Sequence, residues 1–351
     1  MQRQKPIGAR LCMGIATATI ALIPLAGLAQ TTASAADYEL VADYKLGAPS
    51  FWDYLSYDPQ GKVLYVAHVD KVEALDIKSG KSLGHIGPFH DTHGIAIVAD
   101  MGKGYADSGD DGVVKVFKLG DLSVTKTIKV SPDADGMLYD PSSRTVLVVA
   151  GDSKNLTVIN VADDTVSKVI TLPGKPEFMA LNEHGEVFVN IADHPSIAKV
   201  DIAAGKVIAS WPLEGCKNPH GLAFDSRADR LFSSCDNAVM IVVDAANGKN
   251  VASLPIGPKC DAVVVDSARR RAMSANADGT LTVVSIGDGD HYTVKRTVLT
   301  YFGGRNATID PTTGTIFLAH GEMKLVSDTK DLTKLRFGYD GLNVAVLKPN
   351  D

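Results

Sequence analysis

Seven ionisable side chains recur along this chain at a spacing of about 40 to 44 residues. They share one position in a repeated phrase, and we call them the polar ring: Asp53, His93, Asp135, Glu177, His220, Asp261 and Arg305. If the fold repeats with the same period around one axis, these side chains converge on a common opening. We therefore predict that the polar ring forms a ligand-binding site.

A second position, ten residues after the end of each phrase, brings further histidines toward the same place. His68 and His320 occupy it in the first and last repeats, which become neighbours when a ring closes. Imidazole and carboxylate groups that converge can hold a divalent metal ion, and an open coordination position could activate water. We therefore predict that His68, His93, His320 and Asp53 are metal ligands, and a divalent metal ion is the one cofactor that the sequence suggests.

The polar ring also has a simpler interpretation. Charged side chains at the opening of a channel are solvated, and Arg305 can pair with Asp261 or Asp53. A surplus of acids then only keeps the surface soluble. Residue types and spacing leave both interpretations open.

The elements that must position these side chains are β-strands. Each repeated phrase precedes a polar turn and a β-branched run, such as Thr145–Val149, that is apolar on both faces, as expected of a strand between two sheets. The phrases are Trp52–Asp58, Thr92–Val98, Ala134–Asp140, Pro176–Asn182, Pro219–Asp225, Cys260–Asp266 and Gly304–Asp310. Their spacing predicts an all-β, seven-bladed β-propeller of four-stranded blades. The blades are expected near residues 50–88, 89–130, 131–173, 174–214, 215–257, 258–300 and 301–351, the last with 38–46.

A second repeated marker predicts tight turns between strands. It reads Asp76–Lys81, Asp201–Lys206 and Asp244–Lys249, each with Gly in the fifth position. The carboxylate can accept backbone N–H bonds, and Gly can adopt the positive φ at the end of the turn. We interpret these aspartates as structural rather than catalytic.

The last repeat lacks one strand after its phrase. The N-terminal segment 38–46 is free to supply that strand by pairing with the C-terminal one, which would close the ring and remove two open edges. The same repeat contains an insertion, Gly321 to Gly341, where other blades use only a few residues. Because it follows His320, we expect this long loop to be a lid or a recognition element.

With the repeats aligned, the sequence resembles the YVTN/YncE-like family of propeller proteins over nearly its whole length after the N-terminal segment. The most specific stretches are Pro219–Asp225, Arg230–Cys235 and Gly279–Val284. The chain departs from the family at Lys259-Cys260, where a Gly-Pro-like pair is usual. The resemblance implies an exported propeller without implying a reaction, because propellers host unrelated functions.

The cysteines are consistent with an oxidising compartment. The resemblance implies a disulfide between Cys216 and Cys235. Propeller topology places Cys260 near both, so Cys260 is either free or an alternative partner of Cys235. A zinc site made of the three thiolates is a further alternative.

The N-terminus predicts export. Residues 1–35 contain Arg3, Lys5 and Arg10, an apolar stretch and an Ala-x-Ala site, so we interpret them as a signal peptide and residues 36–351 as one propeller domain. Cleavage would lower the formal net charge from -6 to -9. No basic stripe for nucleic acid and no later membrane span is found, so the sequence predicts a periplasmic or secreted protein, expected to be a monomer.

Two functions from different classes follow. The first is a binding protein or scaffold that holds a small molecule, a peptide or a cell-envelope component at the channel mouth. The alternative is a metal-assisted hydrolase or lyase for a lactone, ester or glycosidic-type substrate, with Arg305 orienting an anionic group. The sequence contains no Gly-x-Ser-x-Gly, His-Glu-x-x-His or Cys-x-x-Cys-His motif, so it assigns no catalytic residue.

Overall fold

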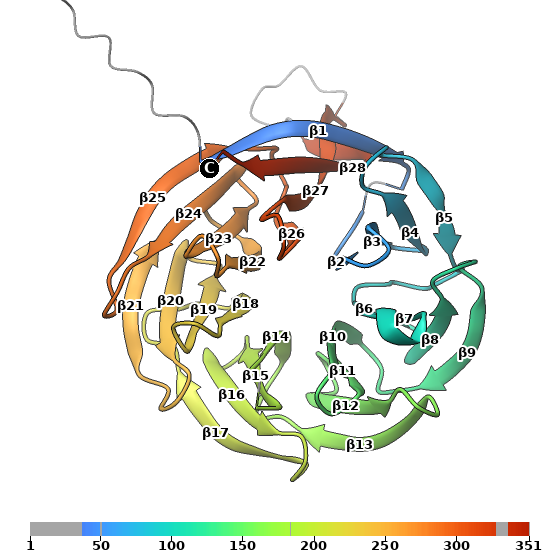
Figure 1. The fold of residues 1–351 in the computed structure, drawn as a ribbon, viewed down its shortest axis with the longest axis horizontal. Coiled ribbons are helices and arrows are strands. Elements are labelled where there is room, and N and C mark those ends of the chain that lie inside the picture. The colour runs from blue at the N-terminus through green and yellow to red at the C-terminus, as the bar shows by residue number, and fades with distance from the viewer. Residues whose placement is uncertain (1–36, 50, 183, 328–335, 351) are drawn as a thin grey trace, which may run out of the picture. The chain divides into compact units, whose positions relative to one another are not determined.

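The computed structural model describes residues 37–49, 51–182, 184–327 and 336–350. These residues contain twenty-eight β-strands and one short 3-10 helix, Ala99–Met101. The strands form seven antiparallel sheets of four strands each, and the sheets surround a common centre (Figure 1). The predicted seven-bladed β-propeller is therefore confirmed. The predicted signal peptide, residues 1–35, lies outside the described residues.

Each of the first six blades is built from four consecutive strands that run from the centre outwards (Figure 1). Blades one to three contain β2 (Leu55–Asp58), β3 (Val63–His68), β4 (Lys71–Asp76) and β5 (Ser82–Ile86); β6 (Ile95–Val98), β7 (Lys103–Ser108), β8 (Val113–Lys118) and β9 (Val124–Lys129); and β10 (Ala134–Asp140), β11 (Thr145–Ala150), β12 (Asn155–Asn160) and β13 (Thr165–Thr171). Blades four to six contain β14 (Pro176–Leu181), β15 (Glu186–Ile191), β16 (Ser196–Asp201) and β17 (Lys206–Pro212); β18 (Pro219–Asp225), β19 (Arg230–Cys235), β20 (Val239–Asp244) and β21 (Asn250–Pro255); and β22 (Cys260–Asp266), β23 (Arg271–Asn276), β24 (Thr280–Ile286) and β25 (Tyr292–Leu299).

Blade seven combines the two ends of the chain. From the centre outwards it contains β26 (Asn306–Ile309), β27 (Ile316–Leu325), β28 (Phe337–Pro349) and β1 (Tyr38–Gly47). β1 pairs antiparallel with β28, with Leu40 opposite Leu347 and Tyr44 opposite Val344. The predicted closure by the N-terminal strand is confirmed, and the ring has no unpaired blade (Figure 1).

The insertion in blade seven differs from the predicted loop. Its two flanks extend β27 and β28 into a hairpin, with Glu322 opposite Asp340 and Leu325 opposite Phe337. The register shifts by one residue between His320 and Glu322, and the ladder then continues, so that it satisfies backbone groups that a loop would leave to water. The extension contains no apolar run, so the sequence did not predict these strands. Residues 328–335 lie outside the described residues.

The apolar core lies between neighbouring blades. Every residue of β11 is buried, and Val146 and Val148 of that strand share a cluster with Val114 and Val116 of β8. The outermost strand β17 instead alternates between exposed and half-buried positions, as a strand with one solvated face does. The middle strands are therefore sandwiched on both faces, as predicted. Among the described residues, no helix is long and apolar enough to cross a membrane.

The Asp-to-Gly markers are turns between strands. Asp76 Oδ1 accepts hydrogen bonds from the backbone N–H groups of Lys78, at 3.1 Å, and Ser79, at 2.7 Å. Gly80 has a φ of 69° and donates its N–H to the Asp76 carbonyl. These contacts occupy the carboxylate with backbone groups, which supports its structural interpretation.

Candidate functional site

The polar ring lies at the start of the innermost strands. Asp53 and His93 come shortly before β2 and β6, Arg305 directly precedes β26, and the other four ring residues fall in the first two positions of β10, β14, β18 and β22. These strands surround the centre of the propeller (Figure 1). The repeat therefore brings the seven positions to the same end of the channel.

The first part of the ring is centred on His93. Its Nδ1 lies 2.7 Å from Asp53 Oδ2, and its Nε2 lies 3.3 Å from Asp91 Oδ2. Asn306 Nδ2 donates to the other oxygen of Asp53 at 3.0 Å. Burial alone would lower the pKa of His93, but the hydrogen bond and charge of Asp53, with the charges of Asp135 and Asp107, raise this pKa to about 10.

Asp107 fixes the backbone that carries His93. This buried carboxylate accepts hydrogen bonds from the N–H groups of His93 and Gly94, both at 2.7 Å. A Cβ at Gly94 would lie 2.2 Å from the carbonyl oxygen of Asp135 in the next blade. Glycine is therefore required where blades two and three approach each other beside the ring.

The second part of the ring is centred on His220. Its Nδ1 lies 3.2 Å from Glu177 Oε2 and 3.6 Å from Asp261 Oδ1. Arg305 donates from Nε to the other oxygen of Asp261 at 2.7 Å. Burial alone would lower the pKa of His220, but the hydrogen bond to Glu177 and the charges of Asp261, Glu177 and Asp236 raise it to about 9.

Asp135 stands between the two parts. Burial, together with the negative charges of Asp53 and Glu177, raises the pKa of Asp135 to about 8, although the charge of His93 acts in the opposite direction. Neighbouring carboxylates contribute to all three raised pKa values, and at Asp135 burial is the largest cause. The ring therefore holds charges of both signs, with acids and bases paired around the channel mouth.

Below the ring, aromatic side chains meet across the axis. Tyr54 of blade one and Phe178 of blade four have ring centroids 4.7 Å apart. Burial and the nearby carboxylates of Asp135 and Asp53 raise the pKa of the Tyr54 hydroxyl well above its usual range. The two rings narrow the channel directly below its polar end.

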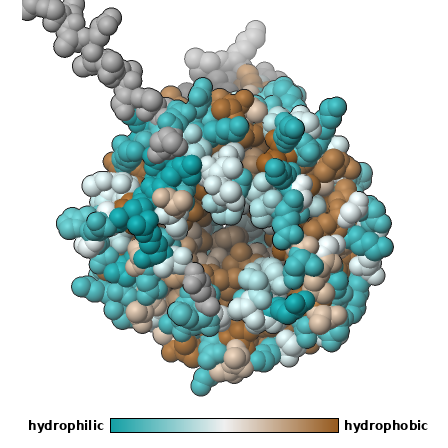
Figure 2. All heavy atoms as spheres, in the orientation of Figure 1, coloured by the Kyte–Doolittle hydropathy of each residue, from teal (hydrophilic) through white to brown (hydrophobic). Residues whose placement is uncertain are grey.

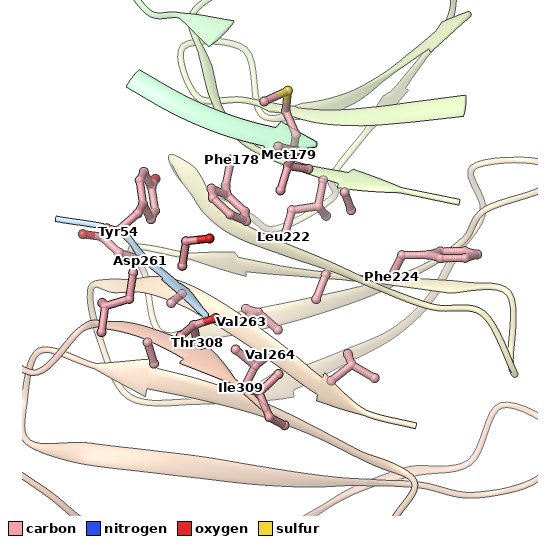
Figure 3. A pocket seen from close by; sticks show the side chains of 18 of the residues that line it. Tyr54, Phe178, Met179, Leu222, Phe224, Asp261, Val263, Val264, Thr308 and Ile309 are labelled. Carbon is pink, nitrogen blue, oxygen red and sulfur yellow. The ribbon is translucent and has the colours of Figure 1, made fainter. Parts of the chain in front are cut away.

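Beyond this contact the channel is apolar. A pocket of about 350 Å³ is lined by side chains such as Leu222, Val264 and Ile309 from the innermost strands. Figure 3 shows Tyr54, Phe178 and Asp261 close together toward one end of it. In Figure 2 the hollow at the centre of the face likewise has hydrophobic residues inside it, with hydrophilic ones along part of its rim. The channel thus changes from charged to apolar along its length.

The predicted metal ligands are divided between different environments. Asp53, His93 and Asp135 offer ligand atoms that all lie within 4.8 Å of one another. His68 is instead buried, with Nε2 at 2.6 Å from the carbonyl oxygen of Pro49 and Nδ1 at 3.5 Å from Glu73. The structure thus joins Asp135, rather than His68, to the predicted pair of Asp53 and His93.

His320 belongs to the closure of the ring. Its Nε2 lies 2.9 Å from Asp43 Oδ1 on β1, and its imidazole stacks on Tyr301 with centroids 3.7 Å apart. The position of His320 in the repeat predicted it as a metal ligand. No sequence pattern marks Asp43 as its partner, because Asp43 comes from the far end of the chain. This histidine contacts β1 instead of joining the Asp53 group.

The cysteines form one disulfide. Cys216 and Cys235 are bonded, with Cα atoms 5.5 Å apart, and Cys260 is a buried free thiol. The pairing implied by the resemblance is confirmed. Because Cys235 is already bonded, neither a Cys235–Cys260 bridge nor a zinc site of three thiolates is formed.

Fold and site together define a β-propeller with seven blades and a charged channel mouth. No protein-family model matches the sequence, and no curated protein matches it either. A solved structure of Kuenenia stuttgartiensis hydrazine synthase is similar, with a TM-score of 0.68 and 14% sequence identity. The match covers 82% of this chain and 94% of the other. At this identity the likeness concerns the fold alone.

Proposed function

We propose that this chain is an exported binding protein, related to the YVTN/YncE-like propellers, and that its polar ring binds a cationic ligand. Export is supported by the signal-like N-terminus and by the Cys216–Cys235 disulfide, which suits an oxidising compartment. The propeller itself suits binding, because it presents residues from seven blades to one opening.

One observation carries the cationic ligand: Asp53, His93 and Asp135 come from three adjacent blades and offer ligand atoms within 4.8 Å of one another. Neighbouring residues fix the positions of Asp53 and His93 by hydrogen bonds. Asn306 donates to Asp53, and Asp107 accepts from the backbone N–H of His93. Such hydrogen bonds orient the side chains of a site before the ligand binds, as the hydrogen bonds to metal-ligating residues do in metalloproteins.

Two sources of positive charge fit this chemistry. A divalent metal ion would displace the proton that His93 carries at neutral pH and use one imidazole nitrogen and two carboxylate oxygens, a donor set suited to zinc or manganese. An organic ammonium group would instead donate hydrogen bonds to the carboxylates of Asp53 and Asp135. The experiment must separate these two sources.

The test uses residues 36–351 prepared without a histidine tag. Metal content is measured by plasma mass spectrometry, and calorimetry then follows titration with Zn²⁺, Mn²⁺, Ca²⁺, Mg²⁺ or cadaverine. We expect saturable binding of at least one cation and a rise in melting temperature on its addition. Binding of a metal but not cadaverine identifies the first source, and the reverse identifies the second. Failure of every cation to bind would refute the proposal.

Variants localise the binding. Asp135→Asn and His93→Gln should weaken it by about tenfold or more, because each removes one of only three donor groups. Asp110→Asn is the matched control, since Asp110 is an exposed carboxylate of blade two that is not part of the Asp53 group. Equal losses in Asp110→Asn and Asp135→Asn would indicate a general surface effect rather than a site.

A metal-assisted hydrolase or lyase is the second candidate, and Arg305 favours it. Its side chain is 41% exposed, so it remains accessible to a ligand although its Nε lies 2.7 Å from Asp261. An arginine beside a metal could orient an anionic ester or lactone while water adds across the acyl bond to give acid and alcohol. Metal-dependent hydrolysis that is lost in Asp135→Asn but retained in Asp110→Asn would support this candidate.

A further inference from the structure

A second pocket lies beside the polar ring, where blades six, seven and one meet. Its volume is about 360 Å³, within the range of small-molecule sites, and its lining includes Phe51, Trp52, Phe302 and Tyr339. Phe51 is 50% exposed and Phe302 is 54% exposed. Two large aromatic side chains are thus left accessible at one pocket.

The aromatic walls are held in place by close packing. Trp52 and Tyr339 meet edge to face, with centroids 5.4 Å apart and an interplanar angle of 71°. A Cβ at Gly321 would lie 2.7 Å from Tyr339 and 2.9 Å from Trp52, and a Cβ at Gly303 would lie 2.4 Å from the Tyr339 hydroxyl. Glycine at both positions therefore lets these rings pack around the pocket.

Tyr339 comes from the hairpin that the blade-seven insertion forms, opposite Met323. The insertion thus contributes a wall of the pocket beside the channel. Other blades have no equivalent extension in the described residues. This pocket is consequently a specific addition to one sector of the ring.

Two cationic side chains complete the lining, Lys259 and Arg305. Lys259 is exposed, and its ammonium group has no ion-pair partner among the residues that the structure describes. Its backbone is fixed, because its carbonyl accepts a hydrogen bond from Ala277 N at 3.3 Å. Arg305 pairs with Asp261 through Nε and is still 41% exposed. The pocket therefore has an ammonium group and a partly exposed guanidinium group beside its aromatic surfaces.

We propose that this pocket binds a planar aromatic carboxylate. Phe51, Phe302 and Trp52 would contact the faces and edges of the ligand ring, while Lys259 and Arg305 would bind its carboxylate. Charge complementarity selects an anion over a neutral or cationic aromatic compound, because both pocket bases carry positive charge. The aromatic walls select a flat ring over an aliphatic acid.

This inference does not rest on the proposed cation site. The aromatic pocket does not include Asp53, His93 or Asp135 in its lining. Naphthoate binding without cation binding, or the reverse, would therefore separate the two proposals. Substitutions at Asp135 should leave the aromatic pocket intact.

The test uses residues 36–351 and three probes of matched size. Fluorescence and calorimetric titrations compare 2-naphthoate with 2-naphthamide, which has the same shape without the charge, and with decahydro-2-naphthoate, which has the charge and two fused rings without aromaticity. We expect saturable binding of 2-naphthoate with a Kd on the order of 0.1 mM and at least tenfold weaker binding of the other two. No saturable binding of 2-naphthoate, or equal binding of the naphthamide, would overturn the proposal.

Two variants localise the probe. Lys259→Gln should weaken 2-naphthoate about five- to tenfold without changing the weak binding of 2-naphthamide, because only the carboxylate contact is lost. Phe302→Ala should weaken both naphthalene probes, and because Phe302 is exposed the variant should keep the fold, which circular dichroism checks. Lys217→Gln, an exposed lysine on blade five, is the matched control. Unchanged binding in both pocket variants would place the probe elsewhere and refute the proposed site.

Discussion

Tyr54 and Phe178 contact each other across the axis of the propeller, although they belong to blades one and four, with ring centroids 4.7 Å apart. Both aromatic rings and Asp261 of the polar ring line the channel pocket of about 350 Å³, whose other lining side chains are mostly apolar (Figure 3). The aromatic pair therefore lies where the charged mouth of the channel meets its apolar interior.

Phe178→Ala should lower the free energy of unfolding by about 1–3 kcal/mol. The substitution removes the ring that packs on Tyr54 and leaves a cavity between opposite blades, but Phe178 is only half-buried, so the loss should be below that of a full core truncation. Urea denaturation followed by fluorescence measures this change. Leu299→Ala is the control, because Leu299 is 84% exposed, and it should be nearly neutral. Equal losses in the two variants would contradict a stabilising contact.

His220 should titrate with a midpoint near pH 9. Burial alone would lower the pKa of its imidazole, but Glu177, Asp261 and Asp236 raise it to about 9, well above the ordinary value of about 6.5. Because the folded-state pKa is raised, the stabilisation from protonated His220 is fully present below about pH 6.5 and is lost as pH rises through 9. The difference in unfolding free energy between the wild type and His220→Gln should shrink over this range.

Imidazole NMR signals provide the direct measurement of the His220 midpoint. The matched comparison is His291, an exposed histidine whose Nδ1 contacts a backbone carbonyl rather than an acid. A His220 midpoint near 6.5 would show that the neighbouring carboxylates do not act on it in solution.

The fold could be predicted from sequence because its information is local and repeated. Each blade has its own phrase and buried middle strands, and three blades also have an Asp-to-Gly turn, so seven weak signals reinforce one another. Closure by β1 was also predictable, since the last repeat lacked one strand. The hairpin extension of the insertion was not, because Glu322, Lys324 and Asp340 give it a polar sequence typical of a loop.

The site could be predicted only as far as strand position determines it. The repeat correctly grouped the ring residues at one end of the innermost strands, but it does not say which way a second-strand side chain turns. His68 and His320 lie at equivalent positions and contact Pro49 and Asp43 instead of the Asp53 group. Those partners lie outside the repeat, so no comparison among repeats could have found them.

Loss of the Cys216–Cys235 bond should lower the free energy of unfolding by about 3 kcal/mol. The bond closes a loop with a sequence separation of 19 residues, and cross-linking restricts the unfolded chain. Denaturation of the oxidised protein and of the Cys216→Ser, Cys235→Ser double variant measures the difference. Cys260→Ser is the control: it keeps the disulfide, and loss of that bond should lower its free energy of unfolding by the same amount. Identical midpoints with and without the disulfide would contradict the prediction.

Cys260 should not react with Ellman's reagent in the folded protein. The thiol is fully buried, burial raises its pKa to about 12, and Sγ donates to the Ala262 carbonyl at 3.1 Å. For residues 36–351, we expect no reactive thiol before unfolding and one per chain in guanidinium chloride. Rapid labelling under native conditions would show that blade six opens locally.

His320→Ala should destabilise the ring closure by about 2–3 kcal/mol. Burial by itself raises the pKa of Asp43, but the hydrogen bond and charge of His320 lower it overall, so the pair links β27 to the N-terminal strand electrostatically. The substitution also removes the imidazole that stacks on Tyr301 and leaves Asp43 without this partner. Lys45→Gln is the matched control on the same strand: its ion pair with Glu322 is largely exposed on both sides, so its loss should leave the free energy of unfolding nearly unchanged. Hydrogen exchange of the β1 amides should accelerate in His320→Ala and not in Lys45→Gln, because only the former contact is buried against the closing strand.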